Sequence, residues 1–555
     1  MAENPTKRQV PHFSPKELLK ARRPERFSDS VVDEAASLDR SILEYHLETL
    51  TNRSQETQFA TFARHLAERE ICPNLLPQTG PTGGGDSKVD SETYPVADDI
   101  ALGWHTGIGR EGASERWGFA FSAKKKWRDK VGPDVDKAVK TGRGYKKLFF
   151  ISSQFIRDKE RGEVEDQLRT KHGLDVRLLD RTWILDRVFT NGHEALAAQD
   201  LQLGTALRRE VRKGPLDTRR EMEQKEIEER IQKAIQEGRF GAQLAEDCIE
   251  SADLARRLER PRMEIDGLYD RAERVAAKSG NEHQRLSCAY QRAWTAFWWY
   301  EDYEQFSHLY EAAEQLAKGS RNAYHLELLS NLWSILHSSV IADKLSAERS
   351  ALAARTEILS SELDRLCQQQ EQPSAVLHAR VLRLQMQLVL NLAAKEPIGP
   401  VLNQFQAVVR SCEGLAGFPL EPLVEILAEL GEHLGSLAAY DELFELVVKV
   451  QSSRKADVET ARMLLRRGAQ KLSARQPYEA IRTLGLSLRK LYKHESRDAA
   501  VHALYLCGRA YESVGLLWAA RGTLLSAASL ATSEFYDYEK VFAFPGCMLP
   551  KAQVA

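Results

Sequence analysis

The sequence predicts two kinds of domain in one chain: an α/β domain with a mixed sheet over the first 200 residues, then an all-α array of helical hairpins. Short apolar or alternating runs separate helical stretches before Asn191, which is the pattern of strands between helices. After that residue only amphipathic helical spacing continues. With 555 residues the chain is also too long for one hydrophobic core.

The α/β domain is expected over residues 31–200. Helical spacing over 31–70 places one stripe at Leu38, Ile42, Tyr45 and Leu50, and a second at Phe59, Phe62, Ala63 and Leu66. Strands are predicted at 93–96, 117–122, 148–151 and 175–179, with helices at 131–139, 161–172 and 181–189. A glycine-rich loop over 98–114 contains Trp104 and His105, and a surface-loop role for His105 is favoured over a catalytic one.

The remaining segments are assigned from composition and spacing. Residues 1–30 combine prolines with lysines and arginines and are predicted to be a flexible basic arm. Residues 201–240 are predicted to be a solvated helical linker, because Glu221, Lys225 and Glu229 follow four-residue spacing. Residues 241–535 are predicted to form an α-solenoid, and 536–555 a ragged tail.

One stretch of the helical region carries a specific pattern. Its members are Leu504, Gly508, Tyr511, Ala520, Leu524 and Ala527, and a second copy retains Leu464, Gly468, Ala480 and Leu484 but has Lys471 in place of the tyrosine. These positions resemble a divergent tetratricopeptide repeat, which implies an array that binds a protein or peptide partner. Trp294, Trp298, Trp299, Tyr300 and Tyr303 form an aromatic cluster, with helix packing or a partner-binding groove as its two interpretations.

Composition excludes several classes of protein. The net charge is -2, so the molecule as a whole is not a polycation. Seven scattered cysteines without a CxxC pair argue against a zinc site or a disulfide framework and fit a reducing compartment. No signal peptide or membrane-length apolar run is evident, so we expect a cytoplasmic protein without a membrane partner.

Two pieces of the α/β domain carry the chemistry. The turn Gly83–Asp90 ends in an acid, and the strand from Trp117 breaks into lysines at Lys124. An acid on one strand beside a lysine on the next would place a divalent-cation ligand next to a group that can neutralise a phosphate oxygen. Hydrolysis of a phosphodiester requires both. The sequence thus predicts a cleft at the sheet edge with Asp90 and Lys124 side by side.

These residues resemble the PD-(D/E)XK restriction-endonuclease-like fold, and within it the Mrr-like nuclease domains of bacterial antiphage effectors. The resemblance implies that Asp90 binds Mg²⁺ or Mn²⁺ and that Lys124 completes the catalytic site, with Ser122 at the position of the family's Glu or Gln. Because serine is a poor metal ligand, Asp86 and Glu56 are the candidates for a second carboxylate, and the carbonyl of Ala123 could add an oxygen. Antiphage defence and a possible homodimer are implied by the resemblance alone.

A run of basic residues follows the proposed site. Attraction to a phosphate backbone and a solvated helix face are its two interpretations. The expected nucleic-acid contacts are Lys125, Lys126, Arg128, Lys130, Arg143, Lys146 and Lys147, together with Gln154 and Arg157 at the end of the next strand. The sequence therefore predicts an endonuclease acting on DNA, controlled by the helical array. An inactive nucleic-acid-binding or scaffolding protein and an RNA-directed nuclease remain alternatives.

Overall fold

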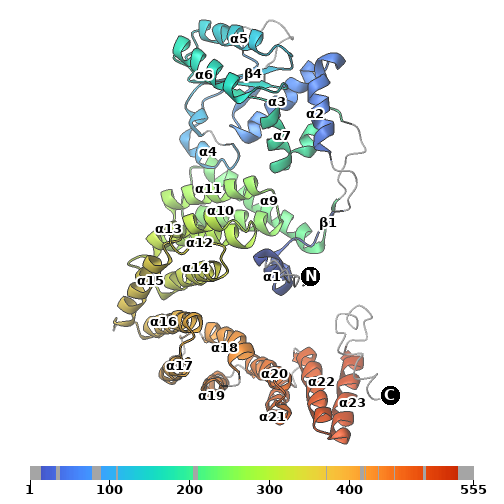
Figure 1. Cartoon of the computed structure of the whole chain (residues 1–555), viewed down its shortest axis with the longest axis vertical. Coiled ribbons are helices and arrows are strands. Elements are labelled where there is room, and N and C mark those ends of the chain that lie inside the picture. Colours follow the sequence, from blue (N-terminus) through green and yellow to red (C-terminus); the bar gives the residue numbers. More distant parts are fainter. Residues whose placement is uncertain are drawn as a thin grey trace, which may run out of the picture. The chain divides into compact units, whose positions relative to one another are not determined.

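The computed structural model describes residues 14–32, 38–77, 89–107, 110–203, 211–369, 372–412, 415, 418, 420–435, 437–454, 457–491 and 496–534. Contacts divide the chain into two compact units, Met1–Leu316 and Ala317–Ala555. The first unit contains a five-stranded sheet and a group of helices, and the second is helical throughout the part that the structure describes (Figure 1).

The sheet is mixed, as the sequence predicts. Its strands lie in the order β2 (Leu75–Pro77), β3 (Ser91–Thr93), β4 (Trp117–Ser122), β5 (Lys147–Ser152) and β6 (Asp175–Leu179). β2, β3 and β4 pair antiparallel, whereas β4, β5 and β6 pair parallel. The three parallel strands therefore end at one edge of the sheet, here called the carboxyl edge, and begin at the opposite edge, here called the amino edge.

Helices cover both faces of this sheet. On one face α5 (Arg128–Lys140) and α6 (Asp158–His172) pack on the even-numbered residues of β4 and β5, such as Ala120 and Phe150. On the other face α3 (Glu56–Glu70) and α7 (Arg181–Thr190) share a core with Phe119 and Ile151. Shorter elements complete this α/β module (38–203): α2 (Arg40–Thr49), η2 (Leu50–Arg53), α4 (Asp98–Leu102), η3 (Arg110–Ala113) and α8 (Glu194–Asp200).

The predicted apolar stripe of the first helix is wrong in phase. Ile42 and Tyr45 are 48% and 68% exposed, while Leu43 and Leu47 are fully buried. α2 begins at Arg40, where Asp39 accepts the backbone N–H of Ser41 at 2.7 Å. Residues of one helical face recur every three to four positions, so the stripe runs through 43 and 47 and not through 42 and 45.

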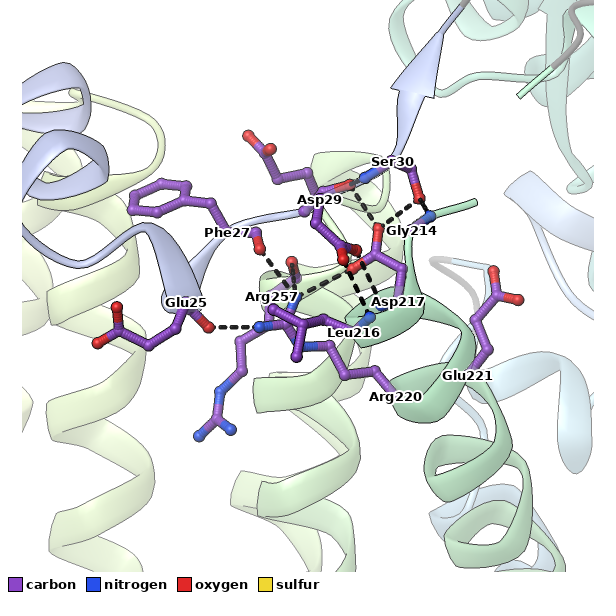
Figure 2. Close-up of polar contacts among 12 residues, drawn as sticks. Glu25, Phe27, Asp29, Ser30, Gly214, Leu216, Asp217, Arg220, Glu221 and Arg257 are labelled. Atoms are coloured by element: carbon purple, nitrogen blue, oxygen red, sulfur yellow. Dashed lines mark hydrogen bonds and ion pairs between the residues drawn. The ribbon is translucent and has the colours of Figure 1, made fainter. Parts of the chain in front are cut away.

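Residues 14–30 are not a loose arm. They form α1 (Pro15–Arg22) and η1 (Pro24–Arg26), and this N-terminal hook is held on the helices that follow the α/β module. Figure 2 shows Asp29 at the start of α9 (Pro215–Gln236), where its carboxylate accepts the backbone N–H groups of Leu216 and Asp217 at 2.9 and 3.0 Å. An acid at that end of a helix satisfies unpaired N–H groups and interacts favourably with the helix dipole.

A buried arginine completes the attachment of the hook. Arg220 is 8% exposed and donates to the carbonyl of Phe27 and to the carboxylate of Asp217, at 2.8 and 2.9 Å, and also to the carbonyl of Glu25. Asp217 accepts the hydroxyls of Ser28 and Ser30 at 2.5 and 2.7 Å. The predicted flexible arm is thus corrected for residues 14–30, and residues 1–13 lie outside those described.

The aromatic cluster near residue 299 receives this hook. Phe27 stacks on Trp299 with ring centroids 5.0 Å apart, and Leu19 joins the same small core. On the other side the Arg256 guanidinium lies 4.6 Å from the centroid of the Trp299 ring. Of the two interpretations of the cluster, helix packing holds for Trp299, and the segment that it packs against comes from the same chain.

A two-stranded ribbon brings the ends of the α/β module together. β1 (Val31–Val32) pairs antiparallel with β7 (Val211–Arg212). The hook before β1 and the helices after β7 belong to one helical group, made of α9, α10 (Ala242–Arg257), α11 (Arg262–Ser279), α12 (Glu282–Trp298) and α13 (Tyr303–Ala317). The α/β module is therefore an insertion within this helical group.

The predicted solvated linker is also corrected. α9 buries Ile227 and Ile231 against α10, so it is part of the helical layer. Its Glu228 accepts two hydrogen bonds from Arg271 of α11, one of them at 2.8 Å. Lys225 and Glu229 lie 4.0 Å apart at the exposed surface, as the four-residue spacing predicts. One helix face is thus solvated while the other is buried.

The second unit is a helical repeat-like array, as expected. Its helices are α14 (Ala323–Ile341), α15 (Leu352–Cys367), α16 (Pro373–Ala394), α17 (Gly399–Ser411), α18 (Glu421–Leu434), α19 (Ala438–Ser453), α20 (Asp457–Ser473), α21 (Pro477–Leu488), α22 (Arg497–Ser513) and α23 (Leu517–Glu534). No helix among the described residues is long and apolar enough to cross a membrane. The predicted tail beyond residue 535 lies outside those residues.

Two hairpins of this array share one packing feature. A Cβ atom added to Gly468 would lie 2.5 Å from Leu484, and one added to Gly508 would lie 2.7 Å from Leu524. Glycine is required because the paired helices approach too closely for a side chain. At the position where the second copy lacks tyrosine, Lys471 is buried and donates to Asp441 of α19 at 2.6 Å.

Candidate functional site

The carboxyl edge brings Asp90 to the end of β4. Asp90 directly precedes β3, and its backbone N–H donates to the carbonyl of Phe119 at 2.8 Å. Its side-chain Oδ2 accepts the N–H of Phe121 at 2.6 Å. Antiparallel pairing of β3 with β4 thus holds the Asp90 carboxylate beside Phe121, which lies three residues before Lys124 in the chain. The two predicted site residues share this edge.

Ser122 and Lys124 lie in the turn at the end of β4. Ser122 ends β4, is 5% exposed, and its Oγ accepts the backbone N–H of Lys124 at 3.3 Å. The Lys124 side chain is exposed and has no ion pair with any residue that the structure describes. The carbonyl of Ala123 accepts the side-chain amide of Gln154 at 3.2 Å. Ser122 therefore shapes the backbone, while Lys124 projects its ammonium group into solvent.

The electrostatic surroundings of Asp90 reveal a second acid that sequence reasoning missed. Although Asp90 retains exposed surface, loss of hydration raises the pKa of its carboxyl, and the charge of Asp134 raises it further. The hydrogen bond from the Phe121 N–H and the charge of the Lys130 ammonium lower the pKa of the Asp90 carboxyl. Asp134, on α5, is 8% exposed and binds Lys130 at 2.9 Å. Asp90 and Asp134 are thus close enough for their charges to interact.

Of the two other predicted acids, only Glu56 lies among the residues that the structure describes. Asp86 lies outside the described residues. Glu56 is the exposed first residue of α3. Ile71, just past the end of α3, lines a cavity with Trp117 at the amino edge, so Glu56 lies toward the carboxyl edge. Within the described part of the chain, Glu56 makes no hydrogen bond or ion pair with Asp90. Among the described residues no group of three His, Cys, Asp or Glu side chains could hold a metal ion.

The predicted nucleic-acid contacts divide between the two edges. Lys125, Lys126 and Arg157 lie at the carboxyl edge, are exposed, and have no ion pair with residues in the described part of the chain. Arg128 and Lys130 begin α5 at the same edge, where Arg128 lies over the Trp127 ring and 3.9 Å from Glu160. Gln154 lies there too, but its amide is engaged by Ala123 and by Ser153 at 2.9 Å.

Three of the predicted contacts lie at the amino edge. Arg143 and Lys146 precede β5, and Lys147 is its first residue. Arg143 binds Glu92 at 2.7 Å, and the Lys147 ammonium lies 4.4 Å from the centroid of the Trp117 ring. A six-residue strand spans roughly 17 Å between its first and last residues. The expectation that the whole basic run flanks one site is therefore wrong for these three residues.

The amino edge has a cavity of its own. About 520 Å³ in volume, it is lined by Trp117, Lys147 and Asp175, the first residues of three parallel strands, and by Phe149 and Arg177. A smaller cavity of about 270 Å³ lies beside Glu70, whose carboxylate accepts the side chains of Asn191 and His193 at 2.9 and 2.6 Å. Its acid is therefore already paired within the protein, and neither cavity contains Asp90 or Lys124.

The loop before η3 has a structural role. The ring of His105 lies 3.4 Å from Arg271 of α11, and the carbonyl of His105 packs so closely on Gly267 that a Cβ there would lie 2.0 Å away. Burial and the neighbouring charges of Arg271 and Arg274 lower the pKa of His105 to about 4. His105 thus anchors the α/β module on the helical group, so the predicted surface-loop role is corrected.

Comparisons with known proteins add little to this description. No family model matches the chain, and no curated protein matches it. Among solved structures, a circular tandem repeat protein with novel repeat topology and enhanced subunit contact surfaces is similar at 13% identity. That match covers 77% of this chain and 91% of the other, with a TM-score of 0.16. A score that low carries no argument about fold or function.

Proposed function

We propose that this protein is a divalent-cation-dependent endonuclease of the PD-(D/E)XK type, acting on DNA, whose activity is governed by its helical array. The observation that carries the proposal is the placement of Asp90 and the Ser122-Ala123-Lys124 turn at one edge of a mixed sheet. The exposed lysines and arginine at that edge support an anionic substrate.

The residues at the carboxyl edge are compatible with one divalent cation. Mg²⁺ retains several waters and commonly takes only one or two protein carboxylates. Asp90 would hold the ion. Asp134 is the neighbouring carboxylate that could serve as a second ligand, because position 122 has a serine where the family pattern has Glu or Gln. A bound cation of this class would supply electrostatic stabilisation of the phosphoryl group.

The chain's own residues contribute the remaining functions. The Phe121 N–H fixes the orientation of the Asp90 carboxylate through Oδ2. The Lys124 ammonium, exposed at the same edge, would neutralise negative charge that develops on the phosphoryl oxygens. Lys125, Lys126 and Arg157 would hold flanking phosphates and so position the scissile bond.

The helical array supports the regulatory part of the proposal. Stacked hairpins offer an extended surface for a protein or peptide partner, and we propose a tetratricopeptide-like kinship from the Gly468 and Gly508 hairpins. An endonuclease within a cell requires control, which such a surface could provide. Antiphage defence and homodimerisation remain proposals that rest on the family resemblance.

Cleavage of supercoiled plasmid in Mg²⁺ or Mn²⁺ tests this function. We expect Asp90→Asn and Lys124→Ala to reduce the cleavage rate by about 100-fold or more, because the first weakens the site for the cation and the second removes a positive charge that would act on the phosphate. Asp134→Asn should reduce it less if Asp134 is the second carboxylate. Lys146→Ala, at the amino edge, is the matched control and should cleave normally. Cleavage that survives both Asp90→Asn and Lys124→Ala would reject this site.

One observation favours a second candidate function. The described carboxyl edge contains no three-acid cluster, and Ser122 is buried where the family pattern has a metal ligand. A nuclease-like module that binds nucleic acid without cutting it would retain the free lysines and dispense with the cation. DNA binding that is unchanged by Asp90→Asn, with no cleavage under any divalent cation, would favour this candidate.

A further inference from the structure

Phe155 is an exposed aromatic residue at the carboxyl edge. It follows β5 in the loop that leads to α6, and 55% of its surface is exposed. Isolated exposed apolar residues are common on protein surfaces and carry no meaning alone. The position of Phe155 becomes informative because of how its loop is held and what surrounds it.

Hydrogen bonds on both sides fix the backbone around Phe155. The N–H of Ser153 donates to the carbonyl of Ser122 at 3.2 Å, and the carbonyl of Gln154 accepts the N–H of Arg181 at 3.1 Å. On the other side Ile156 is 1% exposed, and its N–H donates to Asp180 at 3.1 Å. Since both neighbours are held, the ring of Phe155 is kept at the surface by a rigid support.

Exposed cations lie on the two segments next to this ring, although Asp158 also follows at the start of α6. The bond from the Gln154 amide to the Ala123 carbonyl joins the loop of Phe155 to the turn that carries Lys124. Lys125 and Lys126 continue that turn, and Arg157 follows Phe155 by two residues. All four cations are exposed and have no ion pair with the residues that the structure describes. An aromatic ring among cations is the combination that binds single-stranded nucleic acid, since bases stack while phosphates are neutralised.

We propose that Phe155 stacks on an unpaired base, so that this edge prefers nucleic acid with a single-stranded segment over a continuous duplex. The inference rests on the proposed function and specifies its substrate class. In an intact duplex each base is already stacked on its neighbours, so the ring gains no partner there. In a single strand, a frayed end or a flap, the base face is available while the neighbouring phosphates still reach Lys124 to Lys126.

Binding without divalent cations tests this inference on the full-length chain. Fluorescence anisotropy in EDTA would compare a labelled 20-nucleotide oligo-dT with a blunt 20-base-pair duplex. We expect Phe155→Ala to weaken binding of the single strand by about five- to 100-fold and to change duplex binding by less than about two-fold. Phe155→Trp should retain single-strand affinity. Tyr94→Ala, which removes an exposed aromatic residue just past the end of β3 at the amino edge, is the control and should change neither.

The outcomes separate this inference from the proposed function. Unchanged single-strand affinity in Phe155→Ala, with normal binding by wild type, overturns the inference and leaves the nuclease proposal standing. Equal weakening for both probes also overturns it, because a general surface or folding effect would then explain the loss. Absence of binding to either probe by wild type also overturns the inference, while the nuclease proposal is decided separately by the plasmid cleavage assay. Loss confined to the single strand supports the stacking role.

Discussion

Both edges of the sheet carry basic side chains but use them differently. At the carboxyl edge Lys124, Lys125 and Lys126 project into solvent without an ion pair in the described part of the chain. At the amino edge Arg143 binds Glu92, and Lys147 lies over Trp117. A positive charge that is already paired within the fold attracts an anionic ligand less strongly. The comparison teaches that the pairing of charges within the fold, and not only their presence, decides which edge remains free to attract an anionic ligand.

The amino edge differs further because it is attached to the helical group. Lys278 of α11 binds Asp99, the Arg274 guanidinium donates to the carbonyl of Trp104, and Gly267 packs on His105. All three contacts are made by the connection between β3 and β4. The same connection leads from Asp90 to the strand that ends at Ser122. One edge is therefore an attachment surface, and the other remains accessible.

The sharpest test of this comparison removes positive charge from each edge in a separate variant. Replacing Lys124, Lys125 and Lys126 together with alanine should weaken duplex DNA binding by about 100-fold at low salt. The slope of log affinity against log salt concentration should also fall by about two to three, because each lost phosphate contact contributes about 0.9. Anisotropy titrations over a salt series measure both quantities. The triple variant Arg143→Ala, Lys146→Ala, Lys147→Ala is the matched control. Equal losses at the two edges would remove the distinction.

A pH experiment addresses attachment at the amino edge. His105 has a pKa of about 4 in the folded protein and an ordinary value of 6.5, so its stabilising contribution is complete above pH 6.5 and is lost as the pH falls toward 4. Arg271, Arg274 and Glu228 are the charged groups that face it. We expect the attachment to weaken by about 1.4 kcal/mol at pH 5.5.

Hydrogen exchange of the amides in 98–107, corrected for intrinsic rates at pH 7.5 and 5.5, measures this loss. His105→Gln should remove most of the pH dependence because it cannot be protonated, whereas His308→Gln, at an exposed position of α13, should retain it. The amides next to Phe121 at the carboxyl edge should show no comparable change. A pH dependence that persists in His105→Gln would assign the effect to another group.

The smallest effect is expected from the Glu92 network. The carboxylate of Glu92 accepts Arg143 at 2.7 Å and the hydroxyl of Tyr145 at 2.6 Å, and burial followed by that hydrogen bond raises the pKa of Tyr145 to about 12. Glu92→Gln should lower the free energy of local opening at β3 by about 1 kcal/mol, since a hydrogen bond to a charged group is lost. Hydrogen exchange of the β3 and β4 amides measures it. Lys125→Ala should stay within about 0.5 kcal/mol of wild type, and an equal cost there would contradict the comparison.

The sequence could predict the sheet where apolar runs are long. β4, β5 and β6 and the helices between them follow from continuous or alternating apolar residues, and placing Asp90 and Lys124 at one edge follows from the connection between neighbouring strands. β2 was missed because it has only three residues, one of them Pro77, and so short a segment shows no alternation of apolar and polar residues. Asp134 was missed because its approach to Asp90 depends on the rotation of α5 against the sheet, which spacing alone does not determine.

Two other errors have a common cause. Counting charge along the chain grouped Lys147 with Lys125, although a helix returns the chain across the sheet between them. Likewise the prolines and lysines of the first 30 residues indicated a loose arm. That prediction was wrong because Phe27 packs on Trp299, which lies far away in the sequence. Local composition cannot report contacts between residues so distant along the chain.

The ribbon of β1 and β7 has a practical consequence for dissecting the molecule. Because the chain enters and leaves the α/β module at adjacent strands, a single cut cannot separate that module from its helical neighbour. An expression clone that starts after Ser30 would discard the acid that caps α9 and would deprive Arg220 of the carbonyl acceptors of Glu25 and Phe27. Conversely, the adjacent entry and exit points suit a swap in which a foreign domain replaces residues between Val32 and Val211, leaving the helical portion whole.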